Sequence, residues 1–169
     1  MKLRLPTTLI CAAAITAALG TTAFAAQSAP SARHHKTKTG IVAQWAAAWN
    51  GTEPKALGDL FTADSSYTDQ AIGVTMHGRE EIAGWKERTD SGIDDVHLAV
   101  KAVHRDGHHI TVESVYSGQM KGAPKPFTVP AVALLELDGH RIAAEQDFYS
   151  LNAVLAQSGL PADWTPPAS

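Results

Sequence analysis

The chain has 169 residues, of which 44% are hydrophobic, and it carries a formal net charge of −3 at pH 7. This mild acidity gives no support for nucleic-acid binding, which requires a basic surface. Once the N-terminal segments described below are set aside, the length suits one hydrophobic core and is too short for two domains.

The first 25 residues have the pattern of a bacterial-type secretory signal peptide. Lys2 and Arg4 form a basic start, residues 8–18 form an apolar run, and residues 23–25 match an A-x-A cleavage site. We therefore expect a secreted or periplasmic protein with no stable membrane insertion after cleavage. Cleavage would lower the basic count from 14 to 12 against 17 acidic residues, so the net charge becomes −5, and would also remove Cys11, the single cysteine.

The remainder of the chain divides into three parts by composition. Residues 26–39 are rich in Pro, Ser, His and Lys and lack apolar periodicity, which predicts a disordered linker. We expect one folded domain over residues 40–160 and a flexible C-terminal tail over residues 161–169.

Helical patterns begin the folded region. Apolar residues recur at one-face spacing over residues 41–50, with Trp45 and Trp49 among them, and a short second helix follows with Thr52 as its N-cap. A third helix is expected over residues 79–89. Two short strands are expected between the second and third helices, at residues 65–69 and 74–77.

Long strands joined by tight turns follow these helices. Asp138-Gly139 is flanked by two apolar runs and predicts a hairpin, because Asp-Gly supplies the positive φ angles of a tight turn. Early helices and late hairpins indicate an α+β fold, an antiparallel sheet with helices packed on one side. The predicted strands cover residues 96–103, 109–116, 127–137 and 142–150, and a closing helix covers residues 151–157.

The last predicted strand carries polar residues that a core strand does not need. Glu145, Asp147 and Tyr149 alternate, so they point to the same face. Such a face lies either at the surface, where Asp147 would pair with Arg141 or Lys101, or along a polar cavity. A carboxylate in an apolar pocket has a raised pKa, which is what proton transfer near neutral pH requires.

Four sequence motifs of the folded region are informative when they are taken together and in order. They are Trp49-Asn50-Gly51, LFTADSSYTD at residues 60–69, His77-Gly78 before a helix, and DGHRI…DFYS…L…QSGL at the end. In this series the chain resembles the SnoaL-like, polyketide cyclase-like branch of the nuclear transport factor two-like superfamily over residues 40–160. The resemblance implies a cystatin-like roll, in which a curved sheet and helices form a cone around a single pocket, and a homodimer through the sheet.

The same resemblance implies candidate catalytic residues. Asp147 matches the acid/base Asp on the last strand of limonene epoxide hydrolase-like relatives. Tyr67 and Asp69 match a Tyr-x-Asn that holds the water there, and Asp69 also matches the catalytic base of ketosteroid isomerase-like relatives. The candidate catalytic residues are therefore Asp147, Asp69 and Tyr67.

At several positions this chain lacks the functional residues of these relatives, and this limits the reactions that it could catalyse. Trp45 and Val132 stand where the isomerases have their two oxyanion donors, and a valine side chain donates no hydrogen bond. Ser114 and Tyr116 stand where the epoxide hydrolases have the Arg and second Asp of their relay. A single acid/base Asp that acts on a well-positioned substrate, as in SnoaL-like cyclases, fits better.

Two function classes remain open. One is an acid–base isomerase or cyclase that uses Asp147 on a small apolar carbonyl compound, and the other is a non-catalytic ligand-binding or dimerisation module with the same fold. We expect no metal, because the eight histidines form no HxxxH on a helix and no HxH on a strand, and we expect no cofactor, since the sequence has no Gly-rich phosphate loop. The predicted pocket residues, which suit a flat apolar molecule, are Trp45, Trp49, Trp85, His97, Tyr116, Val132 and Tyr149.

Overall fold

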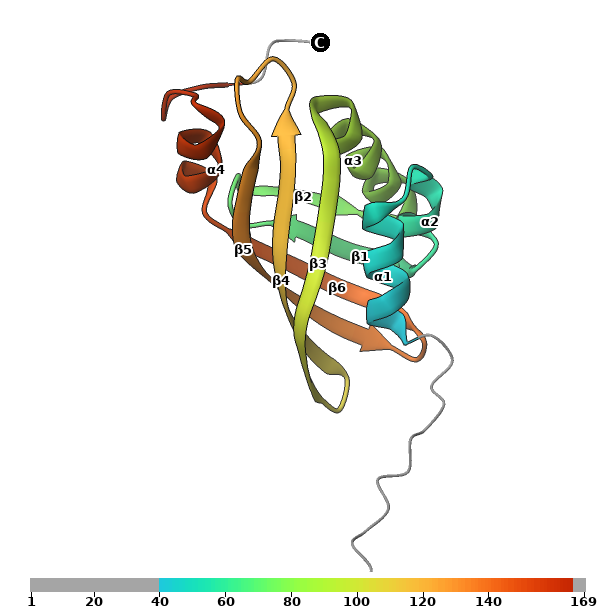
Figure 1. Cartoon of the computed structure of the whole chain (residues 1–169). Coiled ribbons are helices and arrows are strands. Elements are labelled where there is room, and N and C mark those ends of the chain that lie inside the picture. The colour runs from blue at the N-terminus through green and yellow to red at the C-terminus, as the bar shows by residue number, and fades with distance from the viewer. Residues whose placement is uncertain (1–39, 166–169) are drawn as a thin grey trace, which may run out of the picture. The chain divides into compact units, whose positions relative to one another are not determined.

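The computed structural model describes residues 40–165 (Figure 1). The predicted signal peptide and linker, residues 1–39, and residues 166–169 lie outside the described residues. The described elements are, in chain order, α1 (Ile41–Asn50), α2 (Pro54–Gly58), β1 (Phe61–Asp69), β2 (Val74–His77), α3 (Gly78–Gly92), β3 (Ile93–Asp106), β4 (His109–Met120), β5 (Phe127–Asp138), β6 (Arg141–Tyr149) and α4 (Leu151–Ser158).

Every helix and strand expected from the sequence is present, but several bounds differ. β1 begins at Phe61 rather than at residue 65, and β3 extends beyond the predicted residues 96–103 in both directions. The prediction of Thr52 as a helix cap is wrong. Glu53 is the N-cap of α2 and provides no side-chain cap bond, because Pro54 starts the helix and holds the residue before it in extended conformation.

One six-stranded sheet organises the domain, with the strand order β2-β1-β6-β5-β4-β3. β1 and β6 pair in parallel, and every other neighbouring pair is antiparallel. The sheet is therefore mixed, and the prediction of a purely antiparallel sheet is wrong for this one pair. The α+β class with a curved sheet is confirmed, and β6 is an interior strand of that sheet.

The helices lie on one side of the curved sheet (Figure 1). α1 packs against β3, α3 packs against β1 and β2, and α4 packs against β5. The main core between helices and sheet contains Leu57, Phe61 and Ile82, each fully buried. α4 covers a smaller core, and the Ser150 side chain caps this helix by accepting a hydrogen bond from the Ala153 N–H at 3.2 Å.

The end of α1 is attached to the edge of the sheet. The buried face of α1 carries Trp45, Ala48 and Trp49. The Asn50 side chain donates to the Leu98 carbonyl at 3.0 Å, and the Leu98 N–H donates to Asn50 Oδ1 at 2.6 Å. These two bonds join the Trp-Asn-Gly motif to β3, and so fix where the two tryptophans lie relative to the sheet.

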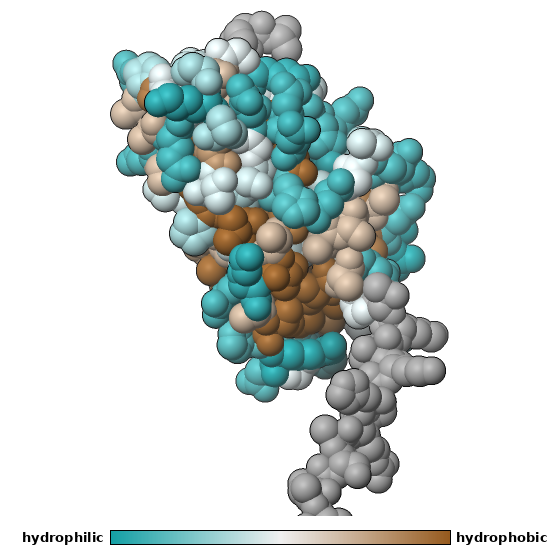
Figure 2. Space-filling model, viewed as in Figure 1, coloured by the Kyte–Doolittle hydropathy of each residue, from teal (hydrophilic) through white to brown (hydrophobic). Residues whose placement is uncertain are grey.

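Part of the inner face of the sheet stays uncovered. Figure 2 shows hydrophobic residues gathered between the lower part of β3 and α1. Val100 and Val103 of β3 are exposed there, although their register partners on β4, Ser114 and Val112, are buried. Within residues 40–165, no helix is long and apolar enough to cross a membrane, and no group of three His, Cys, Asp or Glu side chains could hold a metal ion.

Candidate active site

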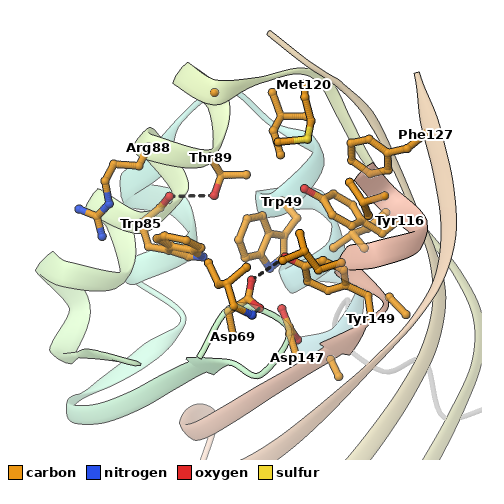
Figure 3. A pocket seen from close by; sticks show the side chains of 18 of the residues that line it. Trp49, Asp69, Trp85, Arg88, Thr89, Tyr116, Met120, Phe127, Asp147 and Tyr149 are labelled. Atoms are coloured by element: carbon orange, nitrogen blue, oxygen red, sulfur yellow. Dashed lines mark hydrogen bonds between the residues drawn. The ribbon is translucent and has the colours of Figure 1, made fainter. Parts of the chain in front are cut away.

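A cavity of about 700 Å³ lies between α1, α3, α4 and the inner face of the sheet (Figure 3). Its walls are mainly apolar, and aromatic side chains come from both helices and strands. This combination suits a flat, largely apolar molecule. The aromatic residues that line it are Trp45, Trp49, Tyr67, Trp85, Tyr116, Phe127, Tyr149 and Trp164.

Acid and phenol side chains alternate across the parallel pair of strands, β1 and β6. Asp69 is the register partner of Asp147, and Tyr67 is the partner of Glu145. The hydrogen bonds run diagonally: the Tyr67 hydroxyl donates to Asp147 Oδ2 at 2.6 Å, and the Tyr149 hydroxyl donates to Asp69 Oδ2 at 3.0 Å. The parallel pairing thus places four of these five side chains in two crossed phenol–carboxylate bonds.

Asp147 faces the cavity and has the properties of a proton carrier. The pKa of Asp147 is raised to about 7: burial is the main cause and the nearby Asp69 charge adds to it, while the hydrogen bond from Tyr67 and the adjacent Glu145 carboxyl oppose the rise. The surface alternative considered above is wrong for this residue, because β6 is an interior strand and the Arg141 guanidinium donates instead to backbone carbonyls, those of Asp59 and Phe61.

Asp69 is held more rigidly than Asp147. Its Oδ1 accepts hydrogen bonds from the backbone N–H groups of Ala71 at 3.0 Å and Ile72 at 3.2 Å, and its Oδ2 accepts from Tyr149. Burial raises its pKa, and these three hydrogen bonds act against the rise. With three donors on its two oxygens, Asp69 is suited to shaping the cavity wall and less suited than Asp147 to taking up a proton.

Glu145 is a third carboxyl that the list of candidate residues did not include. It is 1% exposed and accepts a hydrogen bond on Oε1 from Trp45 Nε1 at 2.8 Å. Burial raises its pKa well above the ordinary value, and the charge of Asp147 adds to the rise. The indole N–H of Trp45 is therefore engaged by Glu145 and is not free to stabilise an oxyanion.

Tyr116 presents a hydroxyl to the cavity. Its ring packs edge-on against Phe127 at 5.0 Å and Tyr149 at 5.5 Å between ring centroids. Figure 3 shows the hydroxyl pointing into the cavity, and within residues 40–165 it has no hydrogen-bond partner. Burial raises the pKa of this phenol, so it stays protonated and can donate near neutral pH.

The basic side chains at and near the cavity interact with groups other than its carboxyls: of the two that line it, Lys121 pairs with Asp94 and Arg88 lies over Trp85. Buried Lys86 donates to the Gly51 carbonyl at 2.8 Å and pairs with Asp90. The Arg88 guanidinium lies 5.4 Å from the Trp85 ring centroid and points away from Asp147 in Figure 3. In the described part of the chain, no basic side chain pairs with Asp69, Glu145 or Asp147.

Nine of the ten residues predicted for the site line this cavity, including all three candidate catalytic residues. The exception is His97, which is exposed, so its predicted place in the pocket is wrong. The register of β3 against β4 shifts between Asp94 and His97, and this bulge turns His97 outward and the neighbouring Leu98 inward. Val132 also lines the cavity, although strand alternation places its side chain on the same face as that of exposed Leu134.

Two residues in or beside the site were not among the residues predicted from the sequence. Trp164 lines the cavity although it lies in the segment predicted as a tail, where no periodicity indicates burial. Glu145 shares a face with Asp147, and that alternation was the available signal. The three residues at alternate positions of β6 indicate a polar face, but the pattern does not say which carboxyl reaches the cavity.

Solved structures share this fold. A protein of ketosteroid isomerase-like fold from Catenulispora acidiphila, solved in complex with trimethylamine, is 60% identical, with a TM-score of 0.74, over 75% of this chain and 97% of that chain. A candidate SnoaL-like polyketide cyclase from Shewanella denitrificans is 15% identical, with a TM-score of 0.62, over 69% of this chain and 93% of that one. A nuclear transport factor two-like protein from Burkholderia thailandensis is 22% identical, with a TM-score of 0.62, over 72% and 95% of the two chains.

Sequence comparison gives the family. Among curated proteins, no significant match to the chain was found. The model of the SnoaL-like domain family matches residues 42–145, which spans α1 to β6 and ends two residues before Asp147. The chain therefore belongs to the SnoaL-like domain family.

Proposed function

We propose that this domain binds a small apolar carbonyl compound and transfers a proton on it, with Asp147 as the acid/base. The observation that carries the proposal is the position of Asp147: its carboxyl faces an aromatic cavity, has a pKa of about 7, and is oriented by Tyr67. A carboxyl with a pKa near the working pH can both accept and return a proton efficiently.

The reaction follows from the positions of two side chains. Asp147 takes a proton from the carbon next to the substrate carbonyl, and the electron pair of that C–H bond forms an enolate. The free hydroxyl of Tyr116 donates to the enolate oxygen. In an isomerisation Asp147 returns the proton to a different carbon; in a cyclisation the enolate carbon attacks a second carbonyl carbon, and Asp147 gives the proton to the new alkoxide.

An exchange assay tests this proposal without knowledge of the product. A panel of cyclic and aromatic diketones would be incubated with the protein in D₂O, and deuterium incorporation would be followed by mass spectrometry. We expect Asp147→Asn to lower the exchange rate by roughly 10²- to 10⁴-fold, the usual contribution of general acid–base catalysis. Equal exchange by the two proteins for every compound that binds would contradict the catalytic role.

Asp69→Asn is the matched control. It removes a carboxylate from the same cavity, while an amide oxygen can still accept the two backbone hydrogen bonds. We therefore expect a much smaller loss of exchange than for Asp147→Asn. A larger loss would assign the proton transfer to Asp69 instead.

A second candidate function is the binding of a small organic ammonium ion without catalysis. Aromatic faces and three carboxyl groups meet in and beside the cavity, and no basic side chain among the described residues neutralises these carboxyls. Such an arrangement attracts a cation over the rings. The Catenulispora acidiphila protein, which is 60% identical, was solved in complex with trimethylamine.

Calorimetric titration with trimethylammonium and with tert-butanol, a neutral molecule of similar shape, separates this candidate from the first. Cation recognition predicts binding of trimethylammonium alone, and tighter binding as pH rises because the carboxyls then ionise. Equal binding of both molecules, or of neither, would remove this candidate.

We also propose that the domain works outside the cytoplasm, on the strength of the N-terminal pattern of Lys2, Arg4, the apolar run and the A-x-A site. N-terminal sequencing of the protein recovered from the periplasm or medium should begin at or near Ala26. Recovery of protein in the cytoplasm that still begins at Met1 would contradict this proposal.

A further inference from the structure

Glu145 and Asp147 form a pair of carboxyls that compete for the same space. They lie two residues apart on β6, and both point to the inner face of the sheet. Glu145 is fully buried and does not line the cavity, whereas Asp147 does. The side chain of Glu145 therefore lies behind Asp147, as seen from the cavity.

Each carboxyl is satisfied on one oxygen only. Trp45 Nε1 donates to Glu145 Oε1 at 2.8 Å, and the Tyr67 hydroxyl donates to Asp147 Oδ2 at 2.6 Å. Glu145 Oε2 and Asp147 Oδ1 are both buried and have no hydrogen-bond partner within residues 40–165; the buried Trp49 indole N–H, which also lacks a partner there, faces Glu145 and lowers its pKa. Two buried carboxylates without a counter-ion would be strongly unfavourable, whereas one proton between these oxygens gives each a partner.

We propose that Glu145 is a positioning residue that carries one proton and donates it in a hydrogen bond from Oε2 to Asp147 Oδ1. This hydrogen bond favours the ionised form of Asp147 and holds its carboxyl from both sides, by Tyr67 on one oxygen and by Glu145 on the other. This inference deepens the proposed acid–base function and rests on it for its role in the reaction. The shared proton itself is a property of the protein without substrate.

The groups that face this pair set its charge. β1 contributes Tyr67 and Asp69, β6 contributes Tyr149, β4 contributes Tyr116, and α1 contributes the indoles of Trp45 and Trp49. Burial raises the pKa of both carboxyls, and their mutual interaction raises that of Glu145 and lowers that of Asp147; Glu145 is also the more enclosed of the two, because it is 1% exposed and does not line the cavity. The proton accordingly resides on Glu145, and Asp147 is the member that exchanges protons with the cavity.

The test is a pH titration of the carboxyl carbons by NMR, with ¹³C-labelled Asp and Glu in the ligand-free protein. Glu145→Gln is the informative variant, because the amide can accept from Trp45 and donate to Asp147 as the protonated acid does. The proposal predicts that Glu145 stays protonated through pH 7 in the wild type, and that Glu145→Gln leaves the midpoint of Asp147 unchanged. Glu145→Leu removes the donor and should raise that midpoint.

A different result would overturn the proposal. If Glu145 were ionised, Glu145→Gln would remove a negative charge beside Asp147 and lower its midpoint by roughly one to three pKa units. A Glu145 signal that titrates near the ordinary glutamate range in the wild type would have the same meaning. Because these readings need no substrate, they stand whether or not the exchange assay finds turnover.

The exchange assay then gives the link to function. If the acid–base function holds, Glu145→Gln should leave the pH profile of the exchange rate unchanged. Glu145→Leu should move the midpoint of that profile to higher pH, by the same amount as the NMR midpoint of Asp147. If Glu145→Leu shifts the NMR midpoint of Asp147 but leaves the pH profile of exchange unchanged, Glu145 has no role in catalysis. Absence of exchange in all proteins would count against the proposed function alone.

Discussion

Asp69 and Asp147 are register partners across β1 and β6, yet each accepts its phenolic hydrogen bond from a tyrosine two positions away along the opposite strand. The two carboxyls therefore lie on neighbouring strands but accept hydrogen bonds from different tyrosines. Both carboxyls line the cavity, but Asp69 is fixed by three hydrogen bonds, whereas Asp147 accepts one, from Tyr67. Pairs of titratable groups with different surroundings are the usual basis for separate acid and base roles.

Tyr67→Phe should raise the pKa of Asp147. The Tyr67 hydroxyl donates to the ionised form of Asp147 and so lowers this pKa, and phenylalanine keeps the ring without the donor. We expect the pH at which deuterium exchange reaches half its maximum to move upward. Tyr149→Phe, which removes the donor to Asp69, is the matched control and should move this midpoint less.

Stability should fall as pH rises across the range in which Asp147 ionises. Its pKa in the folded protein, about 7, lies above the ordinary value of 3.8, so the folded state holds the proton more tightly than the unfolded state. Protonation of Asp147 thus contributes stability that is complete below about pH 4 and is lost as pH rises through 7. At about 1.4 kcal/mol per pKa unit, this contribution is at most about 4 kcal/mol.

Thermal unfolding of the wild type and of Asp147→Asn between pH 4 and 8 checks this sign. The variant is neutral at every pH, so its Tm should change less over this range, and the two curves should diverge most at pH 8. A wild-type curve that rises relative to the variant toward pH 8 would show that Asp147 is stabilised in its ionised form.

Tyr116→Phe should impair turnover with little effect on folding. The hydroxyl lacks a hydrogen-bond partner among the described residues, so its removal leaves no buried group unsatisfied. Loss of an oxyanion donor typically lowers the rate by about 10²- to 10³-fold. Exchange rate and Tm measured together check this: a variant with a normal rate would show that Tyr116 serves only to line the wall.

We propose that a second copy of the chain covers the outer face of the sheet, as the family resemblance implies. Phe148 and Leu134 are 41% and 40% exposed, and Val132 is the register partner of Phe148, so three apolar side chains adjoin there. Phe148→Asp should convert a dimer to a monomer in analytical ultracentrifugation. Val103→Asp, on β3, is the control. If this change dissociates the dimer and Phe148→Asp does not, the dimer contact lies on the edge strand β3.

Local patterns predicted the elements better than their long-range arrangement. The helical spacing in α1 and the Asp138-Gly139 turn are signals within a few residues, and both are confirmed. The parallel pairing of β1 with β6 joins segments about 80 residues apart, so no local pattern indicates it. His97 shows a related limit, because a single bulge reverses the inward and outward positions that alternation predicts.

Strand alternation predicted which residues of β6 share the face of the sheet that carries the site. The alternating residues of β6 indicate a shared face, and Asp147 and Tyr149 are found in the cavity wall. Whether Glu145 reaches the cavity or a buried partner depends on the Trp45 indole, which is 100 residues away in sequence. Trp164 depends likewise on how the C-terminal segment folds back, which its composition does not indicate.

The attachment of Asn50 to Leu98 has a consequence for how a ligand enters. Asn50 acts there as a short extra strand, because it satisfies both the donor and the acceptor of one edge residue. α1 and β3 should therefore move as one body, and the wall that carries Trp45 and Trp49 should not open. Entry and release should depend on the part of the wall outside this unit, to which the C-terminal Trp164 contributes.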